Sequence, residues 1–262
     1  MKKLGAFLVG LGLVTGSVFA AATNSAVSIN TVGFVNKTLT AGEWLLTTCN
    51  FQKVGGGTNT LLDVYGTNQL AQNDLLGLCD LVILFNPNSA TYQTFAQWTD
   101  GNFYLANDGG QWGDSIVSNA VIPVGTAMWV VPAGNQVGAK KLTLAGEVVS
   151  VATQQVSIVS GWQLVGYPFT CDMPLQQTGL AASGAAKNDL LGLCDLVIVW
   201  TGTAYQTYAL WTDNNWYMAN DGGQWGDSIL ASNSLHLAEG FWYIAQNNMT
   251  WSETNKYLNN LK

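Results

Sequence analysis

The chain has 262 residues and a formal net charge of −7 at pH 7, and only 10% of its residues are charged. Every positive side chain is a Lys, because the sequence contains no Arg. A nucleic-acid surface needs clustered cations, so we expect neither a nucleic-acid partner nor attraction to anionic membranes. Hydrophobic residues make up 48% of the chain, enough for a sizeable core, which excludes a disordered protein.

The N-terminus predicts a secretory signal peptide over residues 1–22. Lys2 and Lys3 precede an apolar run over residues 4–19, and the small residues at 20–22 suit cleavage. The run is short for a membrane span, so a retained anchor is the weaker alternative. We therefore expect an exported protein with no transmembrane segment in the mature chain.

Two blocks of the sequence occur twice without change. NDLLGLCDLVI fills residues 73–83 and 188–198, and ANDGGQWGDSI fills residues 106–116 and 219–229. Such self-similarity indicates a tandem duplication, with repeat 1 over residues 23–147 and repeat 2 over residues 148–262. We refer to equivalent positions of the two repeats as twins; Trp44 and Trp162 are one such pair.

Short runs of β-branched and aromatic residues, separated by Gly, Asn, Asp and Ser, predict strands throughout both repeats. Helical periodicity is weak, although residues 70–78 and 181–194 can each hold a short helical turn. The sequence therefore predicts an all-β fold in which each repeat is a small β-sandwich or a partly open barrel.

Repeat 2 also shows a family pattern. It contains Gly-Trp-Gln-Leu at 161–164, Val-Ile-Val-Trp at 197–200, Tyr205, and Glu-Gly-Phe-Trp at 239–242. This resembles a secreted bacterial tandem β-repeat family with the pattern G-W-x-L, V-x-x-W, a Tyr hairpin and G-x-G-[FY]-W. Repeat 1 departs from it, with Glu43 in place of the Gly and Ala127 in place of the last Gly. The resemblance implies a protein that is secreted by a Gram-negative bacterium and is extracellular, at the cell surface or in the periplasm.

The four cysteines fit an exported protein. Cys79 and Cys194 are twins, whereas Cys49 and Cys171 lie on opposite sides of twin Phe residues. Four cysteines allow three pairings, and we favour Cys49 with Cys79 and Cys171 with Cys194, which gives each repeat its own disulfide. The alternative is four buried free thiols. Metal binding is disfavoured, because the sequence has no C-x-x-C spacing.

The second duplicated block concentrates oxygen ligands among glycines. A Ca²⁺ site is one interpretation of this pattern, although it lacks the spacing of an EF-hand. The alternative is a Gly-rich turn in which Asp and Asn cap their own backbone and Trp112 covers the core. The candidate Ca²⁺ ligands are Asn107, Asp108, Asp114, Asn220, Asp221 and Asp227. No other cofactor is expected.

An aromatic hairpin precedes this block in each repeat. Outward-facing rings beside carboxylates and amides can stack on a sugar and bind its hydroxyl groups, since Trp and Tyr combine an apolar body with a polar tip. The alternative is that these rings fill the core. The candidate ligand-binding residues are Trp98, Tyr104, Asp108, Trp112 and Asp114 in repeat 1, and Trp211, Tyr217, Asp221, Trp225 and Asp227 in repeat 2.

Catalysis is disfavoured. Gly113-Asp114-Ser115 imitates a hydrolase motif, but the only histidine, His236, lies in the other repeat without a helical scaffold. A carboxylate pair such as Asp108 and Asp114 leaves glycoside hydrolysis as a distant alternative. We expect a non-catalytic cell-surface protein with a structural or self-assembling role that involves self-association. The alternative is a lectin-like module that binds surface polysaccharide with one site per repeat.

Overall fold

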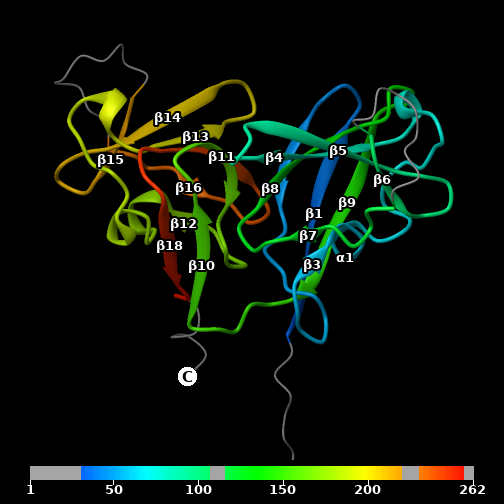
Figure 1. Ribbon diagram of the computed structural model, residues 1–262, viewed down its shortest axis with the longest axis horizontal. Helices are drawn as coiled ribbons and strands as arrows, with labels where there is room; N and C mark the ends of the chain where they lie inside the picture. The colour runs from blue at the N-terminus through cyan, green and yellow to red at the C-terminus, as the bar shows by residue number, and fades with distance from the viewer. Residues whose placement is uncertain (1–30, 107–115, 220–229, 257–262) are drawn as a thin grey trace, which may run out of the picture. The chain divides into compact units, whose positions relative to one another are not determined.

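Antiparallel strands build both repeats, which confirms the predicted all-β class (Figure 1). The computed structural model describes residues 31–106, 116–219 and 230–256, so the predicted signal peptide lies outside the described residues. Contacts along the chain group Val32–Lys262 into one compact unit. Within the described ranges, no helix has the length and apolar character needed to cross a membrane.

Repeat 1 contains one large sheet and two small ones. Its large sheet has five strands in the order β2-β8-β4-β5-β6, and the pairs β1-β9 and β3-β7 form separate two-stranded sheets. The strands are β1 (Val32–Thr40), β2 (Leu45–Thr48), β3 (Asn59–Thr60), β4 (Leu81–Asn86), β5 (Thr91–Gln97), β6 (Phe103–Leu105), β7 (Val121–Ile122), β8 (Ala127–Val131) and β9 (Ala139–Glu147).

Repeat 2 has the same topology, strand for strand. Its large sheet has the order β11-β17-β13-β14-β15, with β10-β18 and β12-β16 as the small sheets. The strands are β10 (Thr153–Ile158), β11 (Gly161–Gly166), β12 (Met173–Pro174), β13 (Leu196–Trp200), β14 (Tyr205–Leu210), β15 (Trp216–Met218), β16 (Ser234–Leu235), β17 (Gly240–Ala245) and β18 (Met249–Thr254). No sheet among the described strands closes into a barrel, and the two groups of sheets are consistent with two β-sandwich repeats.

Helical turns are short and lie in the connections. The one α-helix in the described ranges, α1 (Leu61–Tyr65), begins at a capping box in which Thr60 and Asp63 exchange hydrogen bonds. The 3-10 turns are η1 (Leu76–Leu78), η2 (Leu175–Gln177), η3 (Ala181–Ser183) and η4 (Leu191–Leu193). The turns η1, η3 and η4 fall in the two segments where the sequence allows a helical turn, whereas α1 lies outside them.

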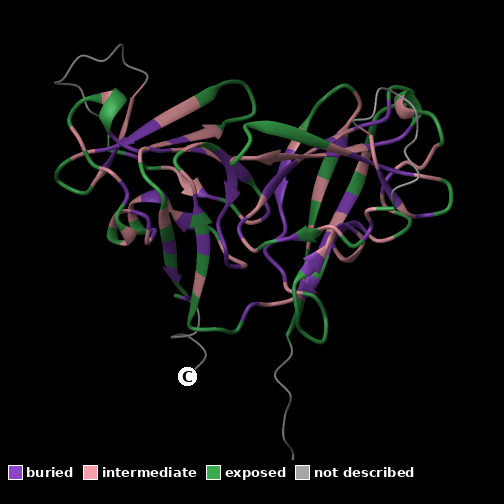
Figure 2. Ribbon diagram, in the orientation of Figure 1, coloured by how far each residue is buried: buried purple, intermediate pink, exposed green. Residues whose placement is uncertain are grey.

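Each core lies between the large sheet and the long two-stranded ribbon of the same repeat. In repeat 1, Val82 and Met128 of the sheet share a buried cluster with Leu39 of β1 and Leu142 of β9. Alternate residues of the ribbons are buried and exposed, as the banding of β9, β10 and β18 in Figure 2 shows. The same alternation leaves the opposite face of each large sheet outside its own core.

The two repeats meet through twin residues. A Cβ atom on Gly166 would collide with Thr48, its twin, and one on Gly240 would collide with Ala127, its twin. Leu46 and its twin Leu164 belong to the same buried cluster. Contacts between equivalent residues are the mark of an isologous, two-fold interface, here formed within one chain.

The predicted disulfides are wrong, because all four cysteines are free thiols. The thiol of Cys49 donates to the carbonyl of Phe51 at 3.5 Å, and the thiol of Cys79 donates to the carbonyl of Leu76 at 3.4 Å. Cys194 repeats the contact of its twin with Leu191 at 3.5 Å, and Cys171 is only partly buried. Burial raises the pKa of both Cys49 and Cys79 to about 11, which keeps these thiols protonated and unreactive at neutral pH.

Candidate functional site

Four of the predicted ligand-binding residues form two equivalent stacked pairs. Trp98 stacks on Tyr104 with ring centroids 3.8 Å apart, and Trp211 stacks on Tyr217 at 4.2 Å. Tyr104 is only 7% exposed, so its ring packs within repeat 1 and presents little surface to a ligand. Its twin Tyr217 is only partly buried, as are Trp98 and Trp211.

A carboxylate holds each of these pairs in place. The hydroxyl of Tyr104 donates to Asp100 Oδ2 at 2.8 Å, and that of Tyr217 donates to Asp213 Oδ2 at 2.7 Å. Hydrogen bonds from Asn102 and Tyr104 lower the pKa of Asp100, and the bond from Tyr217 lowers the pKa of Asp213. Both carboxylates are therefore ionised at neutral pH and engaged within the turn.

The remaining predicted ligand and Ca²⁺ residues lie outside the described residues; they are Asn107, Asp108, Trp112, Asp114, Asn220, Asp221, Trp225 and Asp227. Within residues 31–106, 116–219 and 230–256, no three His, Cys, Asp or Glu side chains form a cluster that could hold a metal ion.

The aromatic hairpins have buried rings at one end and exposed rings at the other. Phe95 and Phe103 in repeat 1, like Tyr208 and Trp216 in repeat 2, are buried in the cores. At the opposite end, the twins Tyr92 and Tyr205 are 49% and 45% exposed. Tyr92 is the second residue of β5 and Tyr205 the first of β14, and both lie among residues of the two repeats.

Strand register collects further aromatic side chains on the outer faces of the two large sheets. Trp129 of β8 lies opposite Leu46 and Ile83, and its twin Trp242 of β17 lies opposite Leu164 and Ile198. Directly opposed residues of neighbouring strands share a face. The outer faces thus hold four aromatic twin pairs: Trp44 and Trp162, Phe85 and Trp200, Tyr92 and Tyr205, and Trp129 and Trp242.

Two adjoining pockets lie among these aromatic residues. The polar pocket, about 950 Å³, is lined by Trp44, Trp129, Trp200, Glu43, His236 and Glu239, among others. The apolar pocket, about 710 Å³, is lined by Phe85, Pro87, Ala90, Trp162, Ile198 and Trp242, among others. Tyr92, Tyr205 and Trp242 line both. We call the two pockets together the inter-repeat groove.

Ring contacts fix the walls of the groove. Trp44 meets Trp129 edge-on with centroids 6.0 Å apart, and the twin pair Trp162 and Trp242 does the same at 5.6 Å. Phe85 of repeat 1 contacts Trp242 of repeat 2 at 5.4 Å. Each such contact adds about 0.5–1.5 kcal/mol beyond the area that it buries. The walls are therefore held in place before any ligand arrives.

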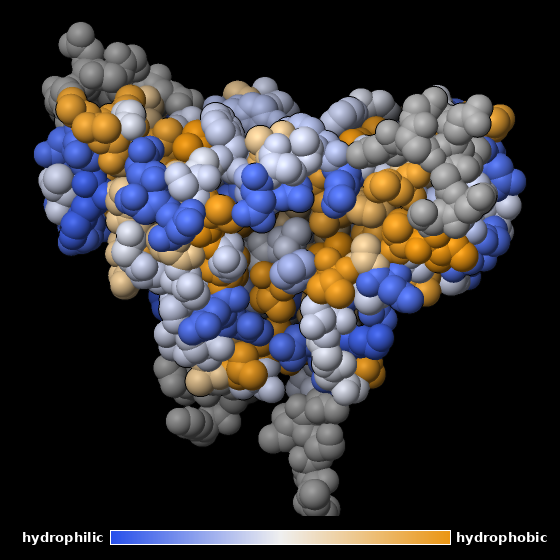
Figure 3. Space-filling view, in the orientation of Figure 1, coloured by the Kyte–Doolittle hydropathy of each residue, from blue (hydrophilic) through white to orange (hydrophobic). Residues whose placement is uncertain are grey.

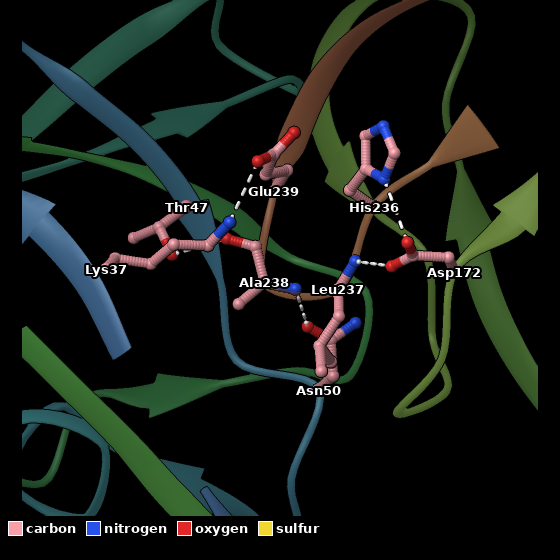
Figure 4. A network of polar contacts seen from close by, with 8 residues as sticks. All are labelled: Lys37, Thr47, Asn50, Asp172, His236, Leu237, Ala238 and Glu239. Atoms are coloured by element: carbon pink, nitrogen blue, oxygen red, sulfur yellow. Dashed lines mark hydrogen bonds and ion pairs between the residues drawn. The ribbon is translucent and has the colours of Figure 1, made fainter. Parts of the chain in front are cut away.

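A network of polar contacts builds the rim of the polar pocket (Figure 4). Lys37 of β1 forms an ion pair of 2.9 Å with Glu239, which crosses from one repeat to the other. His236 Nδ1 lies 3.0 Å from Asp172 Oδ2, while the backbone N–H of Leu237 donates to Asp172 Oδ1 at 2.8 Å. These contacts position Glu239 and His236 beside the aromatic walls.

Residues 236–239 are also held by side chains of repeat 1. The hydroxyl of Thr47 donates to the carbonyl of Ala238 at 2.8 Å, and the backbone N–H of Ala238 donates to Asn50 Oδ1 at 2.8 Å. Partial burial would raise the pKa of Asp172, but the hydrogen bonds from Leu237 and His236 outweigh it and lower that pKa. The carboxylate of Asp172 is thus a fixed negative anchor for the segment at neutral pH.

The groove can bind a flat, polar molecule that has one apolar face. Exposed indole rings offer stacking surfaces, with Trp44 57% and Trp200 44% exposed. Carboxylate, imidazole, amide and hydroxyl groups from Glu43, His236, Asn233 and Thr201 lie around them. A few placed polar groups around an aromatic lining are typical of ligand sites.

Sequence reasoning missed this groove. The available signal was that four aromatic twin pairs survive outside the two identical blocks, although the loops between them have diverged. Their convergence depends on strand register and on the docking of one repeat against the other, which the sequence pattern does not state.

Comparisons with known proteins identify no relative: no protein-family model matches the chain, and searches of curated proteins and of solved structures give no match.

Proposed function

We propose that the mature protein is a non-catalytic, exported binding protein that holds a neutral glycan in the inter-repeat groove. The observation that carries this proposal is the gathering of exposed Trp and Tyr rings from both repeats around a rim of carboxylate, amide and hydroxyl groups. Apolar ring faces match the C–H face of a pyranose, while the rim groups accept and donate hydrogen bonds to its hydroxyls.

Charge supports an uncharged ligand. Two carboxylates, Glu43 and Glu239, line the polar pocket, and the Lys nearest to Glu239 is already paired with it. A chain with a net charge of −7 repels polyanions at long range. An acidic polysaccharide is therefore a poorer ligand than a neutral one.

Co-sedimentation with insoluble neutral polysaccharides tests the proposal. The mature protein is expected to sediment with at least one of cellulose, chitin or mannan. Trp200→Ala is expected to weaken binding about tenfold, equivalent to about 1.4 kcal/mol, because it removes an exposed ring of the groove.

Trp211→Ala is the matched control, since Trp211 stacks on Tyr217 at the far end of the hairpin. Loss of binding in Trp211→Ala with normal binding in Trp200→Ala would move the site to the hairpin end. Loss of binding in EDTA would instead implicate the acidic loops and Ca²⁺.

Self-association is the second candidate function, and the β1-β9 ribbon favours it. Among the described strands this sheet has two members, and the outer edge of β1 pairs with no other described strand. The outer edge of β9, in contrast, is bridged at Glu147 by Gln52. Its exposed face presents Phe34, which is 69% exposed, and Val32, which is 62% exposed. A nine-residue edge strand whose exposed face begins with two apolar side chains is a template for pairing with a second copy.

Sedimentation velocity over a concentration series tests this second function. We expect the wild type to form oligomers and Phe34→Ser to shift them toward monomer. Val137→Ser is the matched control, because Val137 is 95% exposed but lies in the connection between β8 and β9. A wild type that stays monomeric at every concentration contradicts self-association.

A further inference from the structure

The two pockets of the groove share three rings and each contains one of the twin indoles Trp44 and Trp162, but they differ in chemistry. The polar pocket has Glu43, His236 and Glu239 in its lining. Their twins, Gly161, Pro123 and Thr126, carry no charge, and of these only Gly161 lines the apolar pocket. The aromatic members, in contrast, are present in both repeats. The difference between the pockets therefore lies in their polar groups.

The apolar pocket offers few hydrogen-bonding partners. Besides the rings, its lining contains Pro87, Ala90 and Ile198, with Ser160 and Thr207 as the residues with aliphatic hydroxyl groups. A sugar placed there would lose hydrogen bonds from its hydroxyls to water without adequate replacement, and a buried hydroxyl without a partner costs free energy. Alkyl or aryl groups meet no such penalty and gain free energy by leaving water.

The pockets share Tyr92, Tyr205 and Trp242, so one ligand that lies against these three rings reaches both. On the premise that the groove binds a neutral glycan, we propose that the apolar pocket binds an alkyl or aryl group attached to that glycan. The ligand class is then an amphipathic glycoside, with its sugar in the polar pocket and its apolar substituent in the other.

Paired glycosides test this inference. Affinities of the mature protein are measured by calorimetry for the methyl and hexyl β-glycosides of glucose, galactose and mannose, with 1-hexanol alone as a further probe. The hexyl glycoside of the sugar that binds is expected to bind at least about tenfold more tightly than its methyl glycoside, since several CH₂ groups leave water. 1-Hexanol alone is expected to bind more weakly than the hexyl glycoside.

The duplication supplies a matched pair of variants. Trp162 and Trp44 are twins, 51% and 57% exposed, in the apolar and the polar pocket respectively. We expect Trp162→Ala to abolish the advantage of the hexyl group, so that the hexyl and methyl glycosides bind this variant with affinities within about twofold of each other. Trp44→Ala is expected to weaken both glycosides by a similar factor. A single cooperative thermal unfolding transition in each variant shows that it remains folded.

The outcomes separate the inference from its premise. Equal affinities for methyl and hexyl glycosides overturn the apolar-pocket assignment and leave glycan binding in place. An equal loss of the hexyl advantage in both variants also overturns it. Binding of hexyl glycosides and 1-hexanol alike, without binding of any methyl glycoside or polysaccharide, overturns the proposed function and the inference with it.

Discussion

The two repeats bury the same aspartate and satisfy it in different ways. Asp80 precedes β4 and Asp195 precedes β13, and their exposures are 0% and 1%. Backbone N–H groups of the twins Ala133 and Gln246 donate to the two carboxylates at 2.8 and 2.7 Å. This backbone contact ties the start of one strand to the end of its neighbour in both repeats.

The side-chain partner is what differs. Lys140 of β9 forms an ion pair with Asp80, whereas the hydroxyl of Tyr243 donates to Asp195 at 2.6 Å. Repeat 1 has Val130 at the twin position of Tyr243, so it has no phenol there. The two repeats therefore share the backbone contacts of the buried carboxylate, while a cation in one and a phenol in the other serve as its side-chain partner.

Of the substitutions considered, Lys140→Met should lower the free energy of unfolding most. It leaves the buried Asp80 carboxylate with backbone donors but no cation. Because the Lys140 side chain is itself 27% exposed, the cost lies at the low end of the range for breaking buried ion pairs, about 3 kcal/mol. We expect that loss in the free energy of unfolding, measured with urea at neutral pH. Lys141→Met is the control, since Lys141 is the exposed neighbour. Equal stabilities of the two variants would contradict the role of the ion pair.

Gly166→Thr should cause the next largest loss of stability. It places a second Thr side chain opposite Thr48, where the space holds only one. The new side chain would collide with Thr48 across the two-fold interface, and such overpacking costs about 2 kcal/mol. The double variant Thr48→Gly/Gly166→Thr exchanges the twins and should recover at least half of the loss. Failure of the exchange to recover stability would show that the interface is not symmetric at this point. Urea unfolding measures both.

The sequence predicts the strands well because alternation is a local property. Val82 and Met128 lie on the buried face of their sheet, as a period of two requires. The disulfides were wrong because pairing depends on how far apart two loops lie: Cys79 ends η1 with its thiol on Leu76, while Cys49 faces Phe51. The spacing of cysteines along the sequence does not determine the distance between their Cα atoms in the fold.

The candidate site shows the same limit. Outward-facing rings and core filling were both open interpretations of the hairpin; Tyr92 and Tyr205 are exposed at one end of it, whereas Phe95 and Phe103 are buried. Trp98, however, finds Tyr104 as its stacking partner. The groove depends on contacts such as that of Phe85 with Trp242, which are more than 150 residues apart. Hydrophobic periodicity does not determine which faces of the two repeats pack together.

Tyr243→Phe should have a smaller effect than Lys140→Met. It removes one hydrogen bond to Asp195, and a bond to a buried carboxylate contributes about 1–2 kcal/mol. The loss is limited because Asp195 can take up a proton: burial raises the pKa of Asp195, against the hydrogen bonds from Tyr243 and Gln246. The double-mutant cycle with Asp195→Asn measures the coupling. A coupling free energy of zero would contradict the contact.

The smallest effect is a pH dependence that has opposite signs at two aspartates of repeat 2. Because burial raises the pKa of Asp195, the native state keeps its proton above about pH 3.9, where the unfolded chain has lost it. The slope of unfolding free energy against pH follows the protons bound by the unfolded state minus those bound by the native state, so Asp195 makes stability fall as pH rises through this window. Asp213 does the reverse. The hydrogen bond from Tyr217 lowers the pKa of Asp213, so its contribution to stability is lost only as the pH falls through that lowered value.

Relative to wild type, Asp195→Asn should therefore become more stable as the pH rises from about 3 to 6, and Asp213→Asn less stable, in urea unfolding at each pH. Slopes of the same sign in the two variants would show that burial does not distinguish these carboxylates.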